Sequence, residues 1–255
     1  MLFGESTSER EAHLLLSAAA EGGVNFFDSA EMYPVPQRAE TQGRSEAVLG
    51  AWLRGRRRDN YVVATKVAGP GGMDWLRGGP ASADGANIAA AIDGSLARLG
   101  VDCIDLLQLH WPDRYVPMFG EVDFDPGAAY PAVASVEQQL EALAAAVAAG
   151  KVRAVGLSNE TPWGLMRFCA AADSRDSSES SSGSSSSSSS SSAPLPLPRV
   201  VSLQNAYSLL CRTFDAGLGE CCHQEGVSLL AYSPLAMGLL TGKYLDPGGG
   251  PPEAR

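Results

Sequence analysis

The sequence predicts an α/β fold in which helices cover a parallel β-sheet. Short apolar runs, rich in β-branched and aromatic residues, alternate along the chain with longer segments of helical periodicity. Most of the helical segments end at or just before a glycine, a common helix stop signal. The chain has 255 residues, of which 45% are hydrophobic, enough for one large domain or two small ones. We expect a single domain over residues 1–255.

Helices and strands are expected in alternation, beginning with a helix at Ser8–Glu21. Ser8 and Glu11 form a capping-box pattern at its start. Further helices are predicted at Ser45–Arg54, Asn87–Leu99, Ser135–Ala149, Thr161–Ala172 and Thr213–Glu225. Strands are predicted at Val24–Phe27, Tyr61–Thr65, Ile104–Leu109, Val152–Leu157, Val200–Leu203 and Ser228–Ala231. Such alternation favours a parallel sheet, because a helix can then carry each crossover between strands.

Two segments are not expected to belong to the core. Between Ser174 and Ser192, 15 of 19 residues are serine, and alternating proline and leucine follow. We predict a disordered surface insertion at 174–198, because serine tracts bury too little apolar surface to offset ordering. A neutral repeat is favoured over a phosphorylated regulatory loop, since a homopolymer offers no specific docking chemistry. The Gly/Pro-rich tail at 246–255 is also placed outside the core.

Charge and hydropathy exclude several classes of function. Nineteen basic residues against 29 acidic ones give a formal net charge of -10, which argues against a nucleic-acid partner bound through its phosphates. The longest apolar run, Leu140–Ala149, is about half as long as a membrane span. The N-terminus lacks the basic region and apolar stretch of a secretory signal. We therefore predict a cytoplasmic protein without a membrane segment.

The cysteines and histidines do not form a metal-site pattern. Five cysteines, an odd number, have the spacing of neither a zinc site nor a disulfide framework: Cys103, Cys169, Cys211, Cys221 and Cys222. Three histidines are too few and too scattered for a metal cluster. We expect reduced thiols that pack as small apolar residues, and no metal.

Each predicted strand ends in polar residues. They are Asp28, Lys66, His110, Ser158 with Asn159, Gln204 with Asn205, and Tyr232 with Ser233. The carboxyl ends of parallel strands line the ligand site in α/β folds. One polar strand end is explained by a strand that reaches water, whereas six with mixed acid, base and amide chemistry indicate an active site.

Four residues near these ends suit carbonyl reduction. A buried Lys66 paired with Asp28 would stay charged, and a cation close to the Tyr33 phenol would lower its pKa. The phenol could then give a proton to a carbonyl oxygen that gains negative charge. A neutral His110 could orient that carbonyl by a hydrogen bond. Such a site reduces a carbonyl when a hydride donor faces the carbon.

Several motifs follow one another along the chain: Gly23–Tyr33 with Gly43–Glu46, Ala64–Lys66, Asp105–Pro112, Gly156–Asn159, and Ala231–Leu235 with Gly242–Tyr244. In these motifs the sequence resembles the aldo-keto reductases, and most of all the Tas-like branch related to potassium channel beta subunits. The resemblance covers the chain to Tyr244 apart from the serine tract. It implies a (β/α)8 TIM barrel and an NADP(H) cofactor bound without a Rossmann fold, and the sequence has no GxGxxG fingerprint.

The resemblance also implies a role for each matching residue. Tyr33 would donate the proton, tuned by Lys66 and Asp28, while His110 orients the carbonyl. Trp111 would wall the substrate pocket, and Trp75 and Trp163 are equally well explained by packing. Ser158, Asn159 and Gln204 would hold the nicotinamide carboxamide, and Tyr232 would stack on its ring. The pyrophosphate and adenosine side would meet Ser233, Pro234, Leu235 and Lys243.

The match departs from the family at both ends. About six of the family's eight strand–helix units are expected, without the segment that would clamp an adenosine 2′-phosphate. We therefore interpret the sequence as a truncated NAD(P)H-dependent reductase of an aldehyde or ketone, a small-molecule carbonyl. The alternatives are a catalytically silent cofactor-binding or interaction module, like the channel beta subunits, and an inactive fragment. The sequence leaves the particular carbonyl and the oligomeric state open.

Overall fold

Six strands form one parallel sheet in their order along the chain. The computed structural model describes residues 1–118, 120–130, 132–180, 194–245 and 248–251. The strands are β1 Phe26–Asp28, β2 Val62–Val67, β3 Ile104–Leu109, β4 Val152–Ser158, β5 Val200–Ala206 and β6 Ser228–Tyr232. The helices are α1 Glu9–Glu21, α2 Arg44–Leu53, α3 Gly85–Leu99, α4 Val136–Ala148, α5 Pro162–Ser180 and α6 Leu218–Glu225. Five 3-10 segments occur among the described residues: η1 Arg58–Asn60, η2 Leu76–Gly78, η3 Pro126–Ala128, η4 Thr213–Ala216 and η5 Ala236–Thr241.

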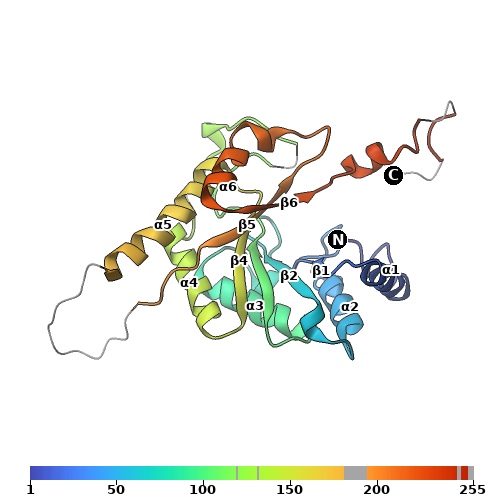
Figure 1. Cartoon of the computed structure of the whole chain (residues 1–255), viewed down its shortest axis with the longest axis horizontal. Helices are drawn as coiled ribbons and strands as arrows, with labels where there is room; N and C mark the ends of the chain where they lie inside the picture. The colour runs from blue at the N-terminus through green and yellow to red at the C-terminus, as the bar shows by residue number, and fades with distance from the viewer. Residues whose placement is uncertain (119, 131, 181–193, 246–247, 252–255) are drawn as a thin grey trace.

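The sheet curls into a half-barrel with the helices packed along it (Figure 1). Each of the helices α1 to α5 contacts the next helix in sequence, so the helices form a continuous layer. Right-handed strand twist and helical crossovers produce this shape when parallel strands follow one another in order. The predicted fold class, an incomplete (β/α)8 type, is confirmed with six of the eight strand–helix units that a full barrel contains.

The main core lies between the sheet and the helices. Side chains of the strands and of the helices are buried together, among them Val63, Ile104, Leu107, Leu157 and Leu203 from the strands and Ile88, Leu140 and Leu165 from the helices. Each of these eight residues is at most 2% exposed. Every residue of β3 is buried, and four of its six residues are apolar, as expected for a strand covered on both faces.

Local sequence signals set several of the helix ends. The capping box of α1 is confirmed, since Glu11 N donates to Ser8 Oγ and the Glu11 carboxylate accepts from Ser8 N at 3.0 Å. The start of α4 has the same arrangement between Ser135 and Gln138. Gly100 ends α3 in the left-handed region at φ 65°, which a residue with a side chain adopts at a cost.

Some predicted bounds were wrong by a few residues. Val24 lies outside β1 because its N–H bonds to Ala19 O at 2.9 Å and so belongs to the turn that ends α1. The helix predicted at Thr213–Glu225 is divided into η4 and α6, because Gly217 between them adopts an extended φ of -165°. The strands β2 and β5 run further than predicted, to Val67 and Ala206.

The structure describes both ends of the predicted serine-rich insertion at 174–198. Helix α5 continues into it as far as Ser180. At its other end Leu197 is 6% exposed and belongs to the main core. Residues 181–193, and 246–247 and 252–255 of the predicted tail, lie outside the described part of the chain.

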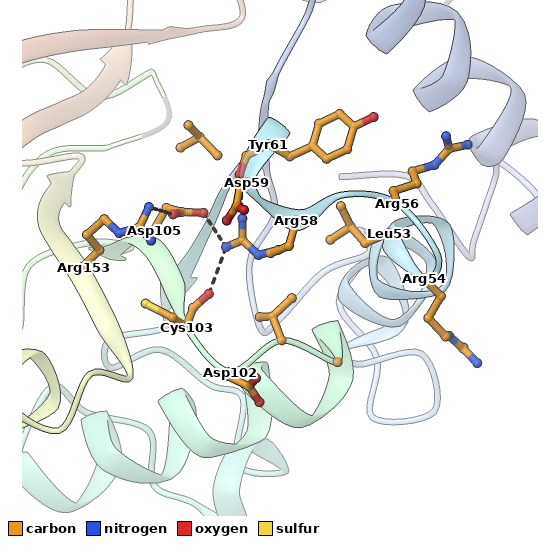
Figure 2. Close-up of a pocket in the computed structure, with 13 residues that line it drawn as sticks. Leu53, Arg54, Arg56, Arg58, Asp59, Tyr61, Asp102, Cys103, Asp105 and Arg153 are labelled. Carbon is orange, nitrogen blue, oxygen red and sulfur yellow. Dashed lines mark hydrogen bonds and ion pairs between the residues drawn. The ribbon is translucent and has the colours of Figure 1, made fainter.

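At the amino-terminal end of the sheet a buried carboxylate joins three strands (Figure 2). Asp105 is 5% exposed and pairs with the guanidinium groups of Arg58 and Arg153, while Val63 N donates to it at 2.8 Å. A pocket of about 440 Å³ opens beside this cluster. Because the carboxylate is already fully paired, and this end of a barrel-type sheet serves stability, we assign the cluster a structural role.

Neither a membrane-spanning helix nor a metal-binding group of side chains occurs among the described residues. No helix there combines the length and the apolar character needed to cross a membrane. Within the same part of the chain, no three His, Cys, Asp or Glu side chains are grouped so that they could hold a metal ion.

Replacing Gly50 by alanine should destabilise the fold, because α2 and the end of α3 meet here backbone to backbone. A Cβ at Gly50 would lie 2.5 Å from Leu99 O and 2.6 Å from Arg98 O. We expect Gly50→Ala to lower the free energy of unfolding by about 1–3 kcal/mol in urea titrations. Gly85→Ala is the matched helical control, since its Cβ would meet only Ala142 Cβ at 3.7 Å. Equal stability of the two variants would contradict this account of the packing.

Candidate active site

The polar residues predicted at the strand ends gather at the carboxyl end of the sheet. The parallel register places Lys66 of β2 beside Gln108 of β3, and Ser158 of β4 beside Gln204 of β5. Asp28 ends β1 and Tyr232 ends β6. His110 directly follows β3, and its N–H donates to Val67 O at 2.9 Å. The common direction of the strands is therefore what brings these side chains to one rim.

Lys66 is a buried cation with two protein partners. Its side chain is 1% exposed, and its ammonium pairs with the Asp28 carboxylate and donates to Ser29 O at 2.8 Å. The second oxygen of Asp28 accepts from Gln108 Nε2 at 2.8 Å. Burial lowers the pKa of Lys66, and Asp28 opposes that shift. Such an arrangement keeps the charged pair in place because both of its members are hydrogen-bonded.

Tyr33 and His110 face one another in front of this pair. The Tyr33 hydroxyl lies 3.4 Å from His110 Nε2, and the two rings meet edge to face with centroids 5.5 Å apart. The Lys66 ammonium lies 5.4 Å from the centre of the Tyr33 ring. Tyr33 is positioned by its backbone, since its N–H donates to Ala30 O at 3.0 Å and its carbonyl accepts from Gly43 N at 3.0 Å.

The electrostatics keep both of these rings neutral. Burial is the main cause that raises the pKa of Tyr33, and the Asp28 charge adds to it. The predicted lowering of this pKa by Lys66 is therefore not found, because Asp28 offsets the lysine charge and the phenol is desolvated. Burial, with Lys66 as a second cause, holds the pKa of His110 well below its usual range. At neutral pH the pair is thus a protonated phenol beside a neutral imidazole.

The ends of β4, β5 and β6 form a second group that is connected to the first. The hydroxyl of Ser158 donates to Gln204 O at 2.8 Å. Asn159 Nδ2 donates to His110 O at 2.9 Å, and Asn159 Oδ1 accepts from the Tyr232 hydroxyl at 2.8 Å. The structure therefore brings Ser158, Asn159, Gln204 and Tyr232 together beside His110.

The residues predicted beyond β6 are not brought to this rim. The chain leads away from the sheet after β6 (Figure 1). Leu235 is 52% exposed, and the Lys243 ammonium lies over the ring of its neighbour Tyr244 at 5.1 Å. Ser233, next to Tyr232, takes a left-handed φ of 53°, and Pro234 after it is exposed.

A cavity of about 520 Å³ opens in front of Tyr33 and His110. It is lined by Met1, Met32, Tyr33, Val35, Gln37, Pro70, Gly71, Gly72, Met73, Trp75, His110, Trp111 and Met118. The prediction places Trp111 in this wall, and the indole donates from Nε1 to Pro70 O at 2.8 Å. Trp75 also lines the cavity, whereas Trp163 is 61% exposed and stacks on Arg114.

The sequence reasoning missed one polar residue and most of the cavity wall. Gln108 is fully buried and donates to Asp28, and the signal was an amide in a strand whose other residues, except Asp105, are apolar. Nothing in the sequence indicated that Met32, Met73 and Met118 line the cavity, because apolar residues in loops carry no pattern that distinguishes a cavity wall from ordinary packing.

The fold and the rim together define a barrel-type enzyme with its polar groups at the carboxyl ends of parallel strands. Comparison with known proteins gives the family. The model of the aldo/keto reductase family matches residues 1–255, and the chain belongs to this family. It is accordingly an oxidoreductase, with carbonyl reduction as the general chemistry of its relatives.

Similar proteins cover the chain to different extents. Protein tas of Escherichia coli is 44% identical over all of this chain and 68% of its own length. An aldo-keto reductase of Babesia bovis is 43% identical over 72% of this chain and 61% of its own length. The L-glyceraldehyde 3-phosphate reductase of Escherichia coli is 29% identical over 96% of this chain and 58% of its own length.

His110 should make the protein less stable in acid. Its pKa in the folded chain lies well below the usual 6.5, so below pH 6.5 the unfolded chain binds a proton that the folded chain does not. As the pH is lowered, this residue alone should therefore reduce the free energy of unfolding by up to about 1.4 kcal/mol per pH unit. We expect His110→Gln to remove that slope in urea titrations between pH 6.5 and 5. The exposed His223→Gln is the control, and an unchanged slope in His110→Gln would refute the assignment.

Proposed function

We propose that this chain reduces an aldehyde or ketone with NADPH, using Tyr33 as the proton donor. The observation that carries the proposal is the arrangement at the base of the cavity. The Tyr33 hydroxyl lies 3.4 Å from His110 Nε2, and the buried Lys66–Asp28 pair lies behind the phenol. The family assignment supports the reaction class, and NADPH rather than NADH follows from the resemblance alone.

The protein groups act in a defined order around the substrate oxygen. His110, neutral and buried, donates a hydrogen bond that orients the carbonyl toward Tyr33. As the carbonyl oxygen gains negative charge, the Tyr33 phenol transfers its proton to that oxygen. Lys66 then stabilises the phenolate that remains, and Asp28 and Gln108 keep the ammonium in position. The raised pKa of Tyr33 ensures that the phenol holds its proton before reaction begins.

The residues at the ends of β4, β5 and β6 fit a nicotinamide cofactor. The amide groups of Asn159, Gln204 and Asn205 offer the donors and acceptors that a carboxamide needs, and Asn205 Oδ1 is buried with no partner among the described residues. Asn159 adopts φ 53°, a conformation that costs about 1–3 kcal/mol and concentrates at ligand sites. When bound, the reduced nicotinamide supplies the hydride for the carbonyl carbon and becomes oxidised.

The cavity suits an uncharged, apolar carbonyl compound. Among the described residues that line it, methionine and tryptophan side chains predominate and none has a charged side chain. Thioether and indole groups make favourable contacts with aromatic and aliphatic surfaces. An anionic substrate would be desolvated there without a partner of opposite charge, at a considerable cost.

Removing the Tyr33 hydroxyl should stop turnover and leave cofactor binding intact. We expect Tyr33→Phe to lower kcat by about 10²- to 10⁴-fold, the usual contribution of a positioned general acid. NADPH consumption with benzaldehyde measures turnover, and quenching of intrinsic fluorescence measures the Kd for NADPH. Tyr61→Phe is the matched control, because Tyr61 packs on Phe27 and Trp52 far from the rim.

Each other outcome has a definite meaning. Undiminished turnover in Tyr33→Phe would refute Tyr33 as the acid. NADPH binding without turnover in the unchanged protein would favour a silent cofactor-binding module, and the absence of both would favour an inactive fragment.

The charge of the substrate should decide how well it is reduced. We expect 4-formylbenzamide to have a kcat/KM about tenfold or more above that of 4-formylbenzoate, because the two differ chiefly in charge and none of the described residues that line the cavity has a cationic side chain for the carboxylate. Initial rates of NADPH oxidation at several concentrations of each aldehyde measure this ratio. A ratio near one, or a preference for the benzoate, would contradict the proposed substrate class.

A further inference from the structure

A second buried ion pair, Glu31–Arg77, lies beside the proton donor and plays no part in the mechanism above. Glu31 is two residues before Tyr33, in the loop that follows β1, and its side chain is 2% exposed. Arg77 belongs to the loop between β2 and α3, and its side chain is 8% exposed. The guanidinium Nη1 pairs directly with Glu31 Oε1.

The Glu31 carboxylate connects the Tyr33 loop to the end of β2. Its Oε1 accepts from Ala68 N at 2.7 Å, two residues after Lys66. Its own backbone N–H donates to Lys66 O at 3.2 Å. Side chain and main chain of one residue therefore fix the loop of the proton donor against the strand that carries the buried lysine.

Arg77 connects the same point to the wall of the cavity. Its guanidinium donates to Asn87 Oδ1 at 2.8 Å, to Ala68 O at 3.1 Å and to Ser82 O at 3.4 Å. These bonds span the loop of residues 69–83, which contributes Pro70, Gly71, Gly72, Met73 and Trp75 to the cavity. One side chain therefore connects both ends of the substrate wall.

The backbone of Arg77 shows that its position is enforced. It adopts φ 53° and ψ 21°, the left-handed region that residues with side chains avoid. This conformation costs about 1–3 kcal/mol and persists only where surrounding contacts over-determine it. The guanidinium bonds to Glu31, Asn87, Ala68 and Ser82 are those contacts.

The pair is set in an apolar cluster, where ions are costly to bury. Ala30, Met32, Ala68, Met73, Leu76 and Trp111 form this cluster, and Tyr33 packs against it. Burial raises the pKa of Glu31, and Arg77 is the main opposing influence. Because apolar residues could fill such a site at least as stably, a buried pair here is better explained by the geometry that it specifies.

We propose that Glu31 and Arg77 are positioning residues that hold the substrate wall of residues 69–83 and the Tyr33 loop in one fixed arrangement. The inference rests on the proposed function for its consequence in catalysis. Breaking the pair frees the wall and the proton donor to move relative to each other. A displacement of about 1 Å between substrate and acid is enough to reduce turnover strongly.

The decisive comparison is between Arg77→Met and Arg58→Met. Both substitutions remove an arginine that pairs with a buried carboxylate and also bonds to backbone carbonyls. Arg58 lies at the opposite end of the sheet, beside Asp105 (Figure 2). Both variants should lose stability, but only Arg77→Met should lose activity per folded molecule, with kcat/KM for benzaldehyde reduced about tenfold or more and the Kd for NADPH within about twofold.

A second readout does not depend on turnover. In Arg77→Met, amide hydrogen exchange should accelerate about tenfold or more at Ala68 and Tyr33 together, relative to Arg58→Met at matched stability. Glu31→Gln keeps the side-chain size and should act in the same direction, which preserves the test if Arg77→Met does not fold. Unchanged exchange at both amides, or equal loss of kcat/KM in Arg58→Met, would overturn the inference. If the unchanged protein has no turnover, the proposed function fails while exchange still decides whether the pair fixes the two loops.

Discussion

The need to neutralise a buried lysine organises the carboxyl end of this sheet. The Lys66 ammonium is almost completely removed from water, and a charge in that position is tolerated only with partners that replace hydration. Asp28 and the carbonyl of Ser29 supply them, and both lie where β1 ends beside β2. Asp28 in turn takes a hydrogen bond from Gln108 on β3. Three neighbouring strands are thereby held in register by one charge.

At the amino-terminal end of the sheet the signs of the buried and partner charges are reversed. There the buried group is an anion, Asp105, and it pairs with Arg58 of η1, just before β2, and with Arg153 near the start of β4. Arg58 is half-buried and Arg153 is exposed, so the cluster faces water and needs no further group. At the carboxyl end the cation is the buried member, and the rings of Tyr33 and His110 stand between it and the cavity. A buried ion pair therefore joins strands at the amino-terminal end of the sheet, and a second one supports the candidate active site at the carboxyl end.

What the sequence could predict depended on how local each signal was. The strand β3 was predicted to the residue because four of its six residues are apolar and it lies in a short run between two helical segments, and the α1 capping box lies within four residues. The prediction of a single helix at Thr213–Glu225 was wrong, because hydrophobic periodicity does not reveal that one glycine, Gly217, adopts an extended φ. The Glu31–Arg77 pair joins residues 46 positions apart, and nothing in either neighbourhood indicates the other. The polar strand ends were predictable as a set, since parallel topology alone brings them together.

The pKa of Tyr33 is raised, although a nearby lysine alone predicts that it is lowered. A lysine near a phenol lowers its pKa only to the extent that the lysine charge is uncompensated, and here Asp28 compensates it while burial acts in the opposite direction. The cavity therefore presents a neutral phenol and a neutral imidazole to its occupant, with the ion pair behind them. On the proposed function, negative charge that develops on a carbonyl oxygen would be stabilised by the Lys66 charge, with the Tyr33 ring between the two. On the same proposal, this coupling makes the phenol the site of proton transfer, and the uncharged lining of the cavity favours substrates that enter without charge.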